Sequence, residues 1–175
     1  MTPIDYRARL QATEQGIVVD SRLEGQPPRH HERAWSGIEA WGVGRPDPTY
    51  PEGVYLLLRE APHGDFLWLR AEGVADVVDA LRRRLPERTA PEIQAEVVRR
   101  ALADLELEAK ALFGAGAWPR VQALIEGEPL LRTPAVGRAV VRLSRGEVAR
   151  LEEMVRTSRV DPRDVLLWAQ MEGLG

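Results

Sequence analysis

The sequence predicts an α+β fold in which an antiparallel sheet carries helices on one side, followed by a C-terminal strand–helix–helix segment. Two observations lead to this prediction. Apolar runs bounded by turn residues fill the first 70 residues, as is typical of paired strands. Apolar residues at helical spacing, with capping residues and glycine or proline stops, follow from residue 74 onward. Strands grouped before helices are typical of the α+β class.

Two hairpins account for the strands expected in the first part of the chain. Residues 4–24 alternate apolar and polar side chains around a turn at residues 14–16. Residues 53–70 contain two nearly continuous apolar runs around a turn at residues 63–65, so both faces of this hairpin should be covered. The intervening residues 25–52 are rich in proline and glycine and are expected to be irregular.

Three helices are predicted next. Residues 74–85 have one apolar face and three arginines in the last turn, where cations suit the helix dipole. Residues 89–113 begin with a capping box formed by Thr89 and Glu92, and a glycine follows them as a stop. Residues 118–127 form a shorter helix that begins at a Trp-Pro pair.

A proline- and glycine-rich stretch at residues 127–137 is the best candidate for a linker. Residues 1–126 would then form one α+β domain, and residues 138–175 a smaller appended segment. A chain of 175 residues is long enough for one domain of ordinary size with such an appendage.

The appended segment is predicted to be one strand followed by two helices. Residues 138–143 alternate, with arginines on one face and apolar side chains on the other. Ser144 opens a helix with Glu147 as its capping partner, and Pro162 occupies the first position of a second helix. Because so short a strand needs a neighbour, we expect the same strand of a second chain to pair with it.

This arrangement resembles the ribbon-helix-helix family of dimeric DNA-binding proteins over residues 137–172. The resemblance implies that two strands pair across a twofold axis and enter the major groove of DNA, which admits a two-stranded ribbon. The residues implied to contact base edges are Arg138, Val140 and Arg142. The residues implied to contact phosphates are Arg145 and Arg163.

Our first interpretation is therefore a cytoplasmic, homodimeric DNA-binding regulator or antitoxin-like protein without enzymatic activity. Its expected partners are DNA, a second copy of itself and a protein bound through residues 1–126. The alternative is a non-enzymatic protein-interaction or ligand-sensing domain that does not bind DNA. Replacing Arg138 and Arg142 by alanine should leave the fold intact if both side chains face outward.

Composition limits these interpretations. The net charge of −3 lacks the overall basic character of many nucleic-acid binders, although seven arginines lie in residues 137–175. The absence of cysteine excludes disulfides and thiolate chemistry. No apolar run approaches the roughly 20 residues of a membrane helix, and residues 1–5 do not begin a secretory signal. We therefore expect a cytoplasmic protein without membrane contact.

Motifs for catalysis or cofactor binding are missing, so we expect no enzyme, cofactor or metal. The sequence has no phosphate loop, no dinucleotide fingerprint and no hydrolase or zinc-protease signature. His30, His31 and Glu32 form the only histidine cluster. Adjacent side chains of an extended segment point to opposite sides, which is poor geometry for a shared metal ion. A solvated loop is expected there.

Five tryptophans are more than a chain of this length requires. We expect core packing for most of them; the alternative is a partner or ligand surface, for which Trp35 and Trp41 are the candidates because they lie in the proline-rich segment. Trp168 lies where the second helix of the resembled family packs into the dimer core, so we expect it to be buried.

Overall fold

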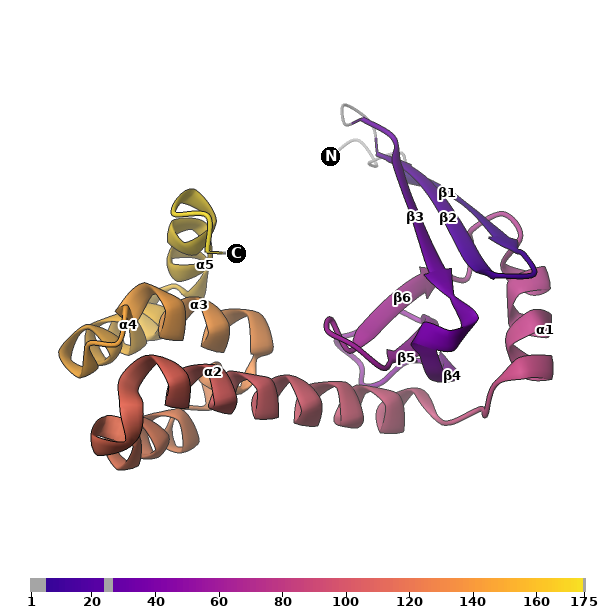
Figure 1. Cartoon of the computed structure of the whole chain (residues 1–175). Helices are drawn as coiled ribbons and strands as arrows, with labels where there is room; N and C mark the ends of the chain where they lie inside the picture. The colour runs from indigo at the N-terminus through magenta and orange to yellow at the C-terminus, as the bar shows by residue number, and fades with distance from the viewer. Residues whose placement is uncertain (1–5, 24–26, 175) are drawn as a thin grey trace. The chain divides into compact units, whose positions relative to one another are not determined.

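The computed structural model describes residues 6–23 and 27–174. It contains two compact units, Met1–Val97 (unit 1) and Val98–Gly175 (unit 2), with antiparallel strands in unit 1 and only helices in the described part of unit 2 (Figure 1). The predicted α+β class is confirmed. The chain divides at residue 97 and not at the linker expected at residues 127–137.

Unit 1 contains two three-stranded antiparallel sheets. Sheet A has the order β1 (Tyr6–Ala12), β2 (Gly16–Leu23), β3 (Arg29–Ala34). Sheet B has the order β4 (Ile38–Gly44), β5 (Gly53–Leu58), β6 (Gly64–Trp68). A short 3₁₀ helix, η1 (Trp35–Gly37), connects the sheets. The hairpins β1–β2 and β5–β6 confirm the two predicted hairpins.

The expectation that residues 25–52 are irregular is wrong for β3 and β4. β3 is an edge strand of exposed polar residues and therefore lacks the apolar alternation that identifies strands in a sequence. β4 is short and contains glycine, but it buries Ile38, Ala40 and Trp41. The predicted solvated loop at His30 is therefore a strand.

Sheet B is covered on both faces, as the continuous apolarity of β5 predicted. Val54, Leu56 and Leu58 share a core with residues of sheet A and α1 (Val74–Arg84). The alternate residues Tyr55 and Leu57 pack with the first turns of α2 (Ala90–Gly127). Since successive side chains of a strand point to opposite faces, each face of β5 contributes to a separate core.

α2 begins and breaks where the sequence predicts. The backbone N–H of Thr89 donates to Glu92 Oε2 at 2.8 Å, and the amide of Glu92 donates back to Thr89 Oγ1 at 3.4 Å, which completes the capping box. Gly114 interrupts α2 with φ 72° and ψ 169°, a conformation outside the helical region. The predicted helix end after residue 113 is confirmed. The second helical piece ends at Gly127 as predicted, but it begins directly after Gly114 with Pro119 in its interior, so the predicted start at residue 118 is wrong.

Unit 2 is built from helices around one apolar core. After α2 come a 3₁₀ helix and three α-helices: η2 (Pro129–Arg132), α3 (Pro134–Ser144), α4 (Val148–Val160) and α5 (Pro162–Met171). The fully buried large side chains of this core are Leu105, Val121, Leu131, Val140, Val141, Leu143, Leu151 and Val165. No helix in the described ranges 6–23 and 27–174 is both long and apolar enough to cross a membrane.

The strand predicted at residues 138–143 is wrong, because these residues lie inside α3. Arg138 and Arg142 are four residues apart, so they share one face in a helix as well as in a strand. Over six residues the two periods cannot be separated, and Pro134 at the first helical position is compatible with the helix that forms. The segment therefore offers no strand for the two-chain ribbon that the resemblance implied.

Three further expectations for this region need correction. The proposed linker is ordered secondary structure, because residues 127–137 contain η2 and the first turn of α3. Ser144 ends α3 and donates its hydroxyl to the carbonyl of Val141, so it does not cap the next helix. Trp168 is exposed and not buried, because α5 turns Val165 and Ala169 toward the core.

Candidate binding recess

The two arginines expected to contact DNA bases are held within unit 2. Arg142 Nε donates to Glu108 Oε1 at 2.5 Å, and its Nη1 donates to the carbonyl of Leu174 at 2.7 Å. Arg138 Nε lies 3.5 Å from the other oxygen of Glu108. About a third of each arginine side chain stays exposed. These contacts fasten α3 to α2 and to the C-terminal residues.

The other residues of the predicted DNA surface do not complete it. Val140 is fully buried. Arg145 pairs with Glu172 at 2.7 Å, and Arg163 pairs with Asp161 at 3.2 Å at the start of α5. Of the predicted set, Arg142 and Arg145 line one open groove of about 630 Å³, where acidic partners neutralise both.

The predicted ligand surface at Trp35 and Trp41 is not formed. Trp41 is fully buried and its indole N–H donates to the carbonyl of Leu85 at 3.3 Å, so its place on a ligand surface is wrong and core packing is confirmed for it. Trp35 is half-buried, and its indole N–H donates to the carbonyl of Thr13 at 3.0 Å. The guanidinium of Arg84 lies 5.2 Å from the Trp35 ring centre, which adds a cation–π contact.

His30 lies on β3 between two carboxylates. Its Nδ1 is 2.7 Å from Asp20 Oδ1, and its Nε2 is 3.4 Å from Glu32 Oε1. The hydrogen bond with Asp20 raises the pKa of His30 above its ordinary value, and Glu32 adds to the rise. Among residues 6–23 and 27–174, no three metal-ligating side chains are grouped so that they would hold a metal ion.

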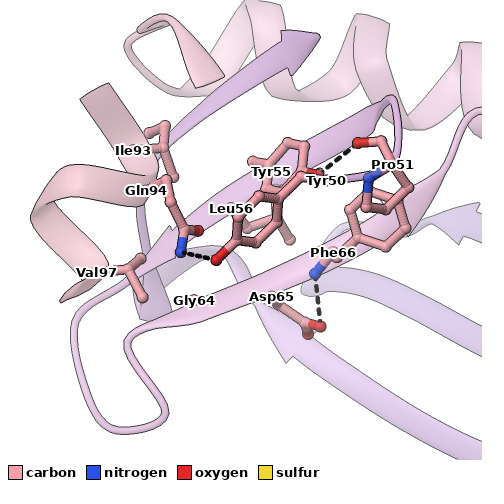
Figure 2. Close-up of a pocket in the computed structure, with 10 residues that line it drawn as sticks. All are labelled: Tyr50, Pro51, Tyr55, Leu56, Gly64, Asp65, Phe66, Ile93, Gln94 and Val97. Carbon is pink, nitrogen blue, oxygen red and sulfur yellow. Dashed lines mark hydrogen bonds between the residues drawn. The ribbon is translucent and has the colours of Figure 1, made fainter. Parts of the chain in front are cut away.

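An apolar recess of about 450 Å³ lies in unit 1, on the face of sheet B that packs against the first turns of α2 (Figure 2). Its lining is mostly aromatic and aliphatic: Tyr50, Pro51, Tyr55, Leu56, Gly64, Asp65, Phe66, Ile93, Gln94 and Val97. The volume lies in the range of sites for small ligands or large side chains. We therefore treat this recess as the candidate functional site.

Paired aromatic rings form the sheet side of the recess. Tyr55 and Phe66 are register partners on β5 and β6, and their ring centres lie 5.0 Å apart at an interplanar angle of 56°. Phe66 also meets Trp68 edge-on at 4.9 Å. Gly53 makes room for this row, because a Cβ atom there would lie 2.0 Å from Cε2 of Phe66. The glycine thus fixes where the Phe66 ring lies.

Two tyrosine hydroxyls are tied at the rim. Gln94 Nε2 on α2 donates to the hydroxyl of Tyr50 at 3.2 Å (Figure 2). The hydroxyl of Tyr55 donates to the carbonyl of Pro51 at 2.5 Å. Burial raises the pKa of Tyr55 above its ordinary value. The Tyr50–Gln94 bond is exposed and joins the loop before β5 to α2.

Asp65 places a polar group at the open edge of sheet B. β6 is the last strand of the sheet, and the backbone N–H of Phe66 donates to Asp65 Oδ1 at 2.9 Å and not to β5. The second oxygen of Asp65 accepts from Arg33 Nε on β3 at 2.7 Å. The carboxylate therefore covers an edge amide, a means by which native sheets protect their edges.

Sequence reasoning missed this site. The hairpin at residues 53–70 and its apolar runs were visible, and a hairpin register would have paired Tyr55 with Phe66. Nothing local in the sequence connects Tyr50 with Gln94, which are 44 residues apart. Comparison with protein-family models, with curated proteins and with solved structures found no match for this chain.

Proposed function

We propose that this protein is a non-enzymatic binding protein that captures an extended peptide, with one large apolar side chain of the peptide seated in the recess of unit 1. One observation carries the proposal: an aromatic-lined recess opens beside the edge strand β6. This proposal makes the protein-interaction alternative from the sequence more specific.

The lining supports an aromatic or branched apolar side chain as the anchor. Tyr55 and Phe66 offer ring faces and edges, and Ile93 and Val97 offer aliphatic surface. Aromatic pairs favour tilted or edge-on contacts, which the existing ring geometry already presents. Burying one such side chain contributes about 1.5–3 kcal/mol, so the anchor alone would bind weakly.

The edge of β6 supports a peptide in preference to a free small molecule. A peptide added beside β6 would take over the amide of Phe66, which Asp65 now covers. Strand addition supplies affinity through main-chain hydrogen bonds and specificity through pockets for alternate side chains. The recess is positioned for the second role because Gly64 and Phe66 belong to both the edge strand and the lining.

The lining favours binding over catalysis. Its ionisable groups are Asp65, Tyr50 and Tyr55. The carboxylate of Asp65 already accepts hydrogen bonds from Arg33 and from its neighbouring amide, and the Tyr55 hydroxyl is engaged with a carbonyl. A general acid or base needs a group free to reach the reacting proton, and these contacts occupy Asp65 and Tyr55. The Tyr50 hydroxyl accepts from Gln94 at the exposed rim of the recess.

DNA binding through residues 138–163 has weaker support. Contact with bases would require Arg138 and Arg142 to leave Glu108, and Val140 to leave the core. The outer arginines, Arg145 and Arg163, are also paired with carboxylates. The net charge of −3 provides no compensating attraction for phosphate.

A nuclear magnetic resonance titration of the full chain tests the proposal. The probe is N-acetyl-tryptophan methylamide, and N-acetyl-alanine methylamide is the matched ligand without an anchor. We expect the tryptophan probe alone to shift the amide signals of Gly64, Phe66 and Gln94. Val97→Phe fills the recess and should weaken the response at least tenfold, whereas Leu112→Ala, outside the recess, should not.

A second variant, which alters the recess in a different way, keeps the test valid if Val97→Phe does not fold. Gly53→Ala forces the Phe66 ring from its place and should also weaken the response, while circular dichroism reports whether the fold persists. Equal responses to both probes, or an undiminished response in folded Val97→Phe, would overturn the proposal. A salt-sensitive shift of α3 amides by a DNA duplex, with none from either probe, would replace it with the DNA-binding interpretation.

A further inference from the structure

An ion pair joins the edge strands of the two sheets in unit 1. Arg33 on β3 donates from its Nε to Asp65 Oδ2 on β6 at 2.7 Å. The arginine side chain is 33% exposed and the aspartate side chain 20% exposed. Within residues 6–23 and 27–174, Asp65 is the one group that hydrogen-bonds or pairs with the Arg33 side chain. The guanidinium therefore depends on this carboxylate for its anionic partner.

Both residues of the ion pair lie on the faces of their sheets that share one core. Arg33 is the register partner of Ile17, which is buried in that core, and register partners point to the same face. Asp65 lies two positions before Leu67, which is buried in the same core. Because side chains alternate along a strand, Phe66 points to the other face of β6, where the recess lies.

A strand added beside β6 would disturb the ion pair. Its carbonyl oxygen would take the amide of Phe66 from Asp65 Oδ1 (Figure 2). Both oxygens of Asp65 belong to one rigid carboxylate, so an oxygen in the place of Oδ1 would lie against Oδ2 and repel it. The carboxylate must then turn away, and Arg33 loses its partner. A partly buried charge left without a partner costs free energy, which a suitable ligand would avoid.

The alternation of an added strand decides which ligand side chain can replace Asp65. A side chain that enters the recess lies on the face of Gly64 and Phe66, so its two sequence neighbours lie on the face of Asp65. With the anchor opposite either Gly64 or Phe66, one of these neighbours lies opposite Asp65. A carboxylate on that neighbour would accept the hydrogen bond of Arg33 that Asp65 gives up.

We propose that the recess captures an acidic peptide, in which a glutamate or aspartate adjoins the large apolar anchor and its carboxylate replaces Asp65 at Arg33. The inference rests on the proposed function and names the class of peptide that the same site takes. The net charge of −3 gives acidic peptides no general attraction to this chain. A preference for an acidic neighbour must therefore come from a specific partner.

Two matched peptides test the inference on the unaltered full chain. Both carry tryptophan as the anchor. Acetyl-Thr-Glu-Trp-Glu-Thr-amide has a glutamate on each side of it, and acetyl-Thr-Gln-Trp-Gln-Thr-amide has glutamines. Both neighbours are exchanged because the direction of the added strand decides which of them lies opposite Asp65. In a titration followed by the amide signals of Gly64 and Phe66, the glutamate peptide should bind about tenfold more tightly, since it gains a charge-assisted hydrogen bond.

Three variants identify the partner of the peptide carboxylate. Arg33→Gln should remove the preference for the glutamate peptide. Arg22→Gln is the matched control, because it removes the same charge from an exposed position on the opposite face of sheet A, and it should keep the preference. Asp65→Ala removes the competing carboxylate, so both peptides should bind more tightly while the glutamate peptide keeps its advantage. Circular dichroism reports whether each variant folds.

The outcomes separate this inference from the proposed function. If both peptides shift the amides of the recess equally in the parent, the inference is wrong and the proposed function stands. The same holds if folded Arg33→Gln keeps the preference, or if Arg22→Gln loses it as well. A preference found in Asp65→Ala alone would mean that Asp65 stays with Arg33 when the peptide binds, which also overturns the inference. If neither peptide shifts these amides, both proposals are wrong.

Discussion

Glu108 holds Arg138 and Arg142 with a single carboxylate, and the three residues join α2 to α3. We expect Glu108→Gln to lower the free energy of unfolding by roughly 1–2 kcal/mol, because the charge assistance of the Arg142 hydrogen bond and the ion pair with Arg138 are lost while both arginines stay partly buried. Urea denaturation measures this change.

Glu106→Gln is the matched control for Glu108. Glu106 precedes Glu108 on α2 and forms an exposed i,i+4 ion pair with Lys110 at 3.1 Å. Its loss should cost less than about 0.5 kcal/mol. Equal effects of the two substitutions would mean that the Glu108 cluster contributes no more than a surface ion pair.

His30 provides a pH-dependent signal at the same scale. Asp20→Asn should bring the pKa of His30 down toward its ordinary value of 6.5, since the hydrogen bond with Asp20 is the largest cause of the rise. Because the folded-state pKa is raised, the stabilisation from protonated His30 is complete below about pH 6.5 and disappears as pH rises through the folded-state value.

The titration is followed by the ring-proton chemical shift of His30. Asp79→Asn is the control, because Asp79 lies at an exposed position of α1 and pairs with Arg82, and it should leave the midpoint in place. A midpoint in Asp20→Asn equal to that of the parent would show that Asp20 does not interact with the imidazole in solution.

At the scale of single elements, α2 contains two glycines whose replacement should have opposite effects. Gly114 has φ 72° and ψ 169°, a region that is nearly exclusive to glycine, so Gly114→Ala should destabilise the protein by about 1–3 kcal/mol. Gly116 is helical with open space around its Cα, so Gly116→Ala should stabilise by about 0.5–1 kcal/mol.

Thermal or urea denaturation of the two variants decides this prediction. The comparison is sharp because both substitutions add one methyl group within three residues of each other. Stabilisation by Gly114→Ala would mean that α2 runs through this position without a break.

Elements were predictable from the sequence where local chemistry was unambiguous. The capping box at Thr89, the stop at Gly114 and the proline at the start of α5 all act within one helical turn. The prediction for residues 138–143 was wrong because their alternation fits both a strand and a helix. Which of the two forms depends on the burial of Val140 against other helices. β3 was not predicted because a polar edge strand forms by pairing with its neighbour β2, which its own sequence does not reveal.

The candidate site was harder to predict than the elements that form it. The recess needs Tyr50 and Gln94 to meet, and it needs Gly53 to leave space for the ring of Phe66. These are tertiary relations without a local signature. The burial of two tryptophans also depends on tertiary packing. Trp41 fills the core although it lies in a proline-rich segment, and Trp168 is exposed although it lies on a helix expected to pack.

At the scale of the whole molecule, each apolar core draws on residues of one unit only. We therefore expect the two units to lose structure separately. Leu151→Ala should destabilise unit 2 by about 2–5 kcal/mol and speed hydrogen exchange in α3 while leaving β5 protected. Leu56→Ala should do the reverse.

Hydrogen exchange resolved by mass spectrometry or magnetic resonance distinguishes these responses. The two leucines are matched, since both are fully buried and lose the same atoms. Faster exchange in both β5 and α3 for either variant would show that the molecule unfolds as one cooperative body.

The carboxylate of Asp65 has a consequence for how the protein behaves at high concentration. Because it accepts from the amide of Phe66, this edge amide is not available to pair with a strand of a neighbouring molecule. A ligand that displaces Asp65 must therefore both compete with this side chain and replace its protective role. If a peptide strand adds beside β6 as proposed, it must displace the Asp65 carboxylate from the Phe66 amide, so only a strand whose own contacts outweigh this hydrogen bond would bind.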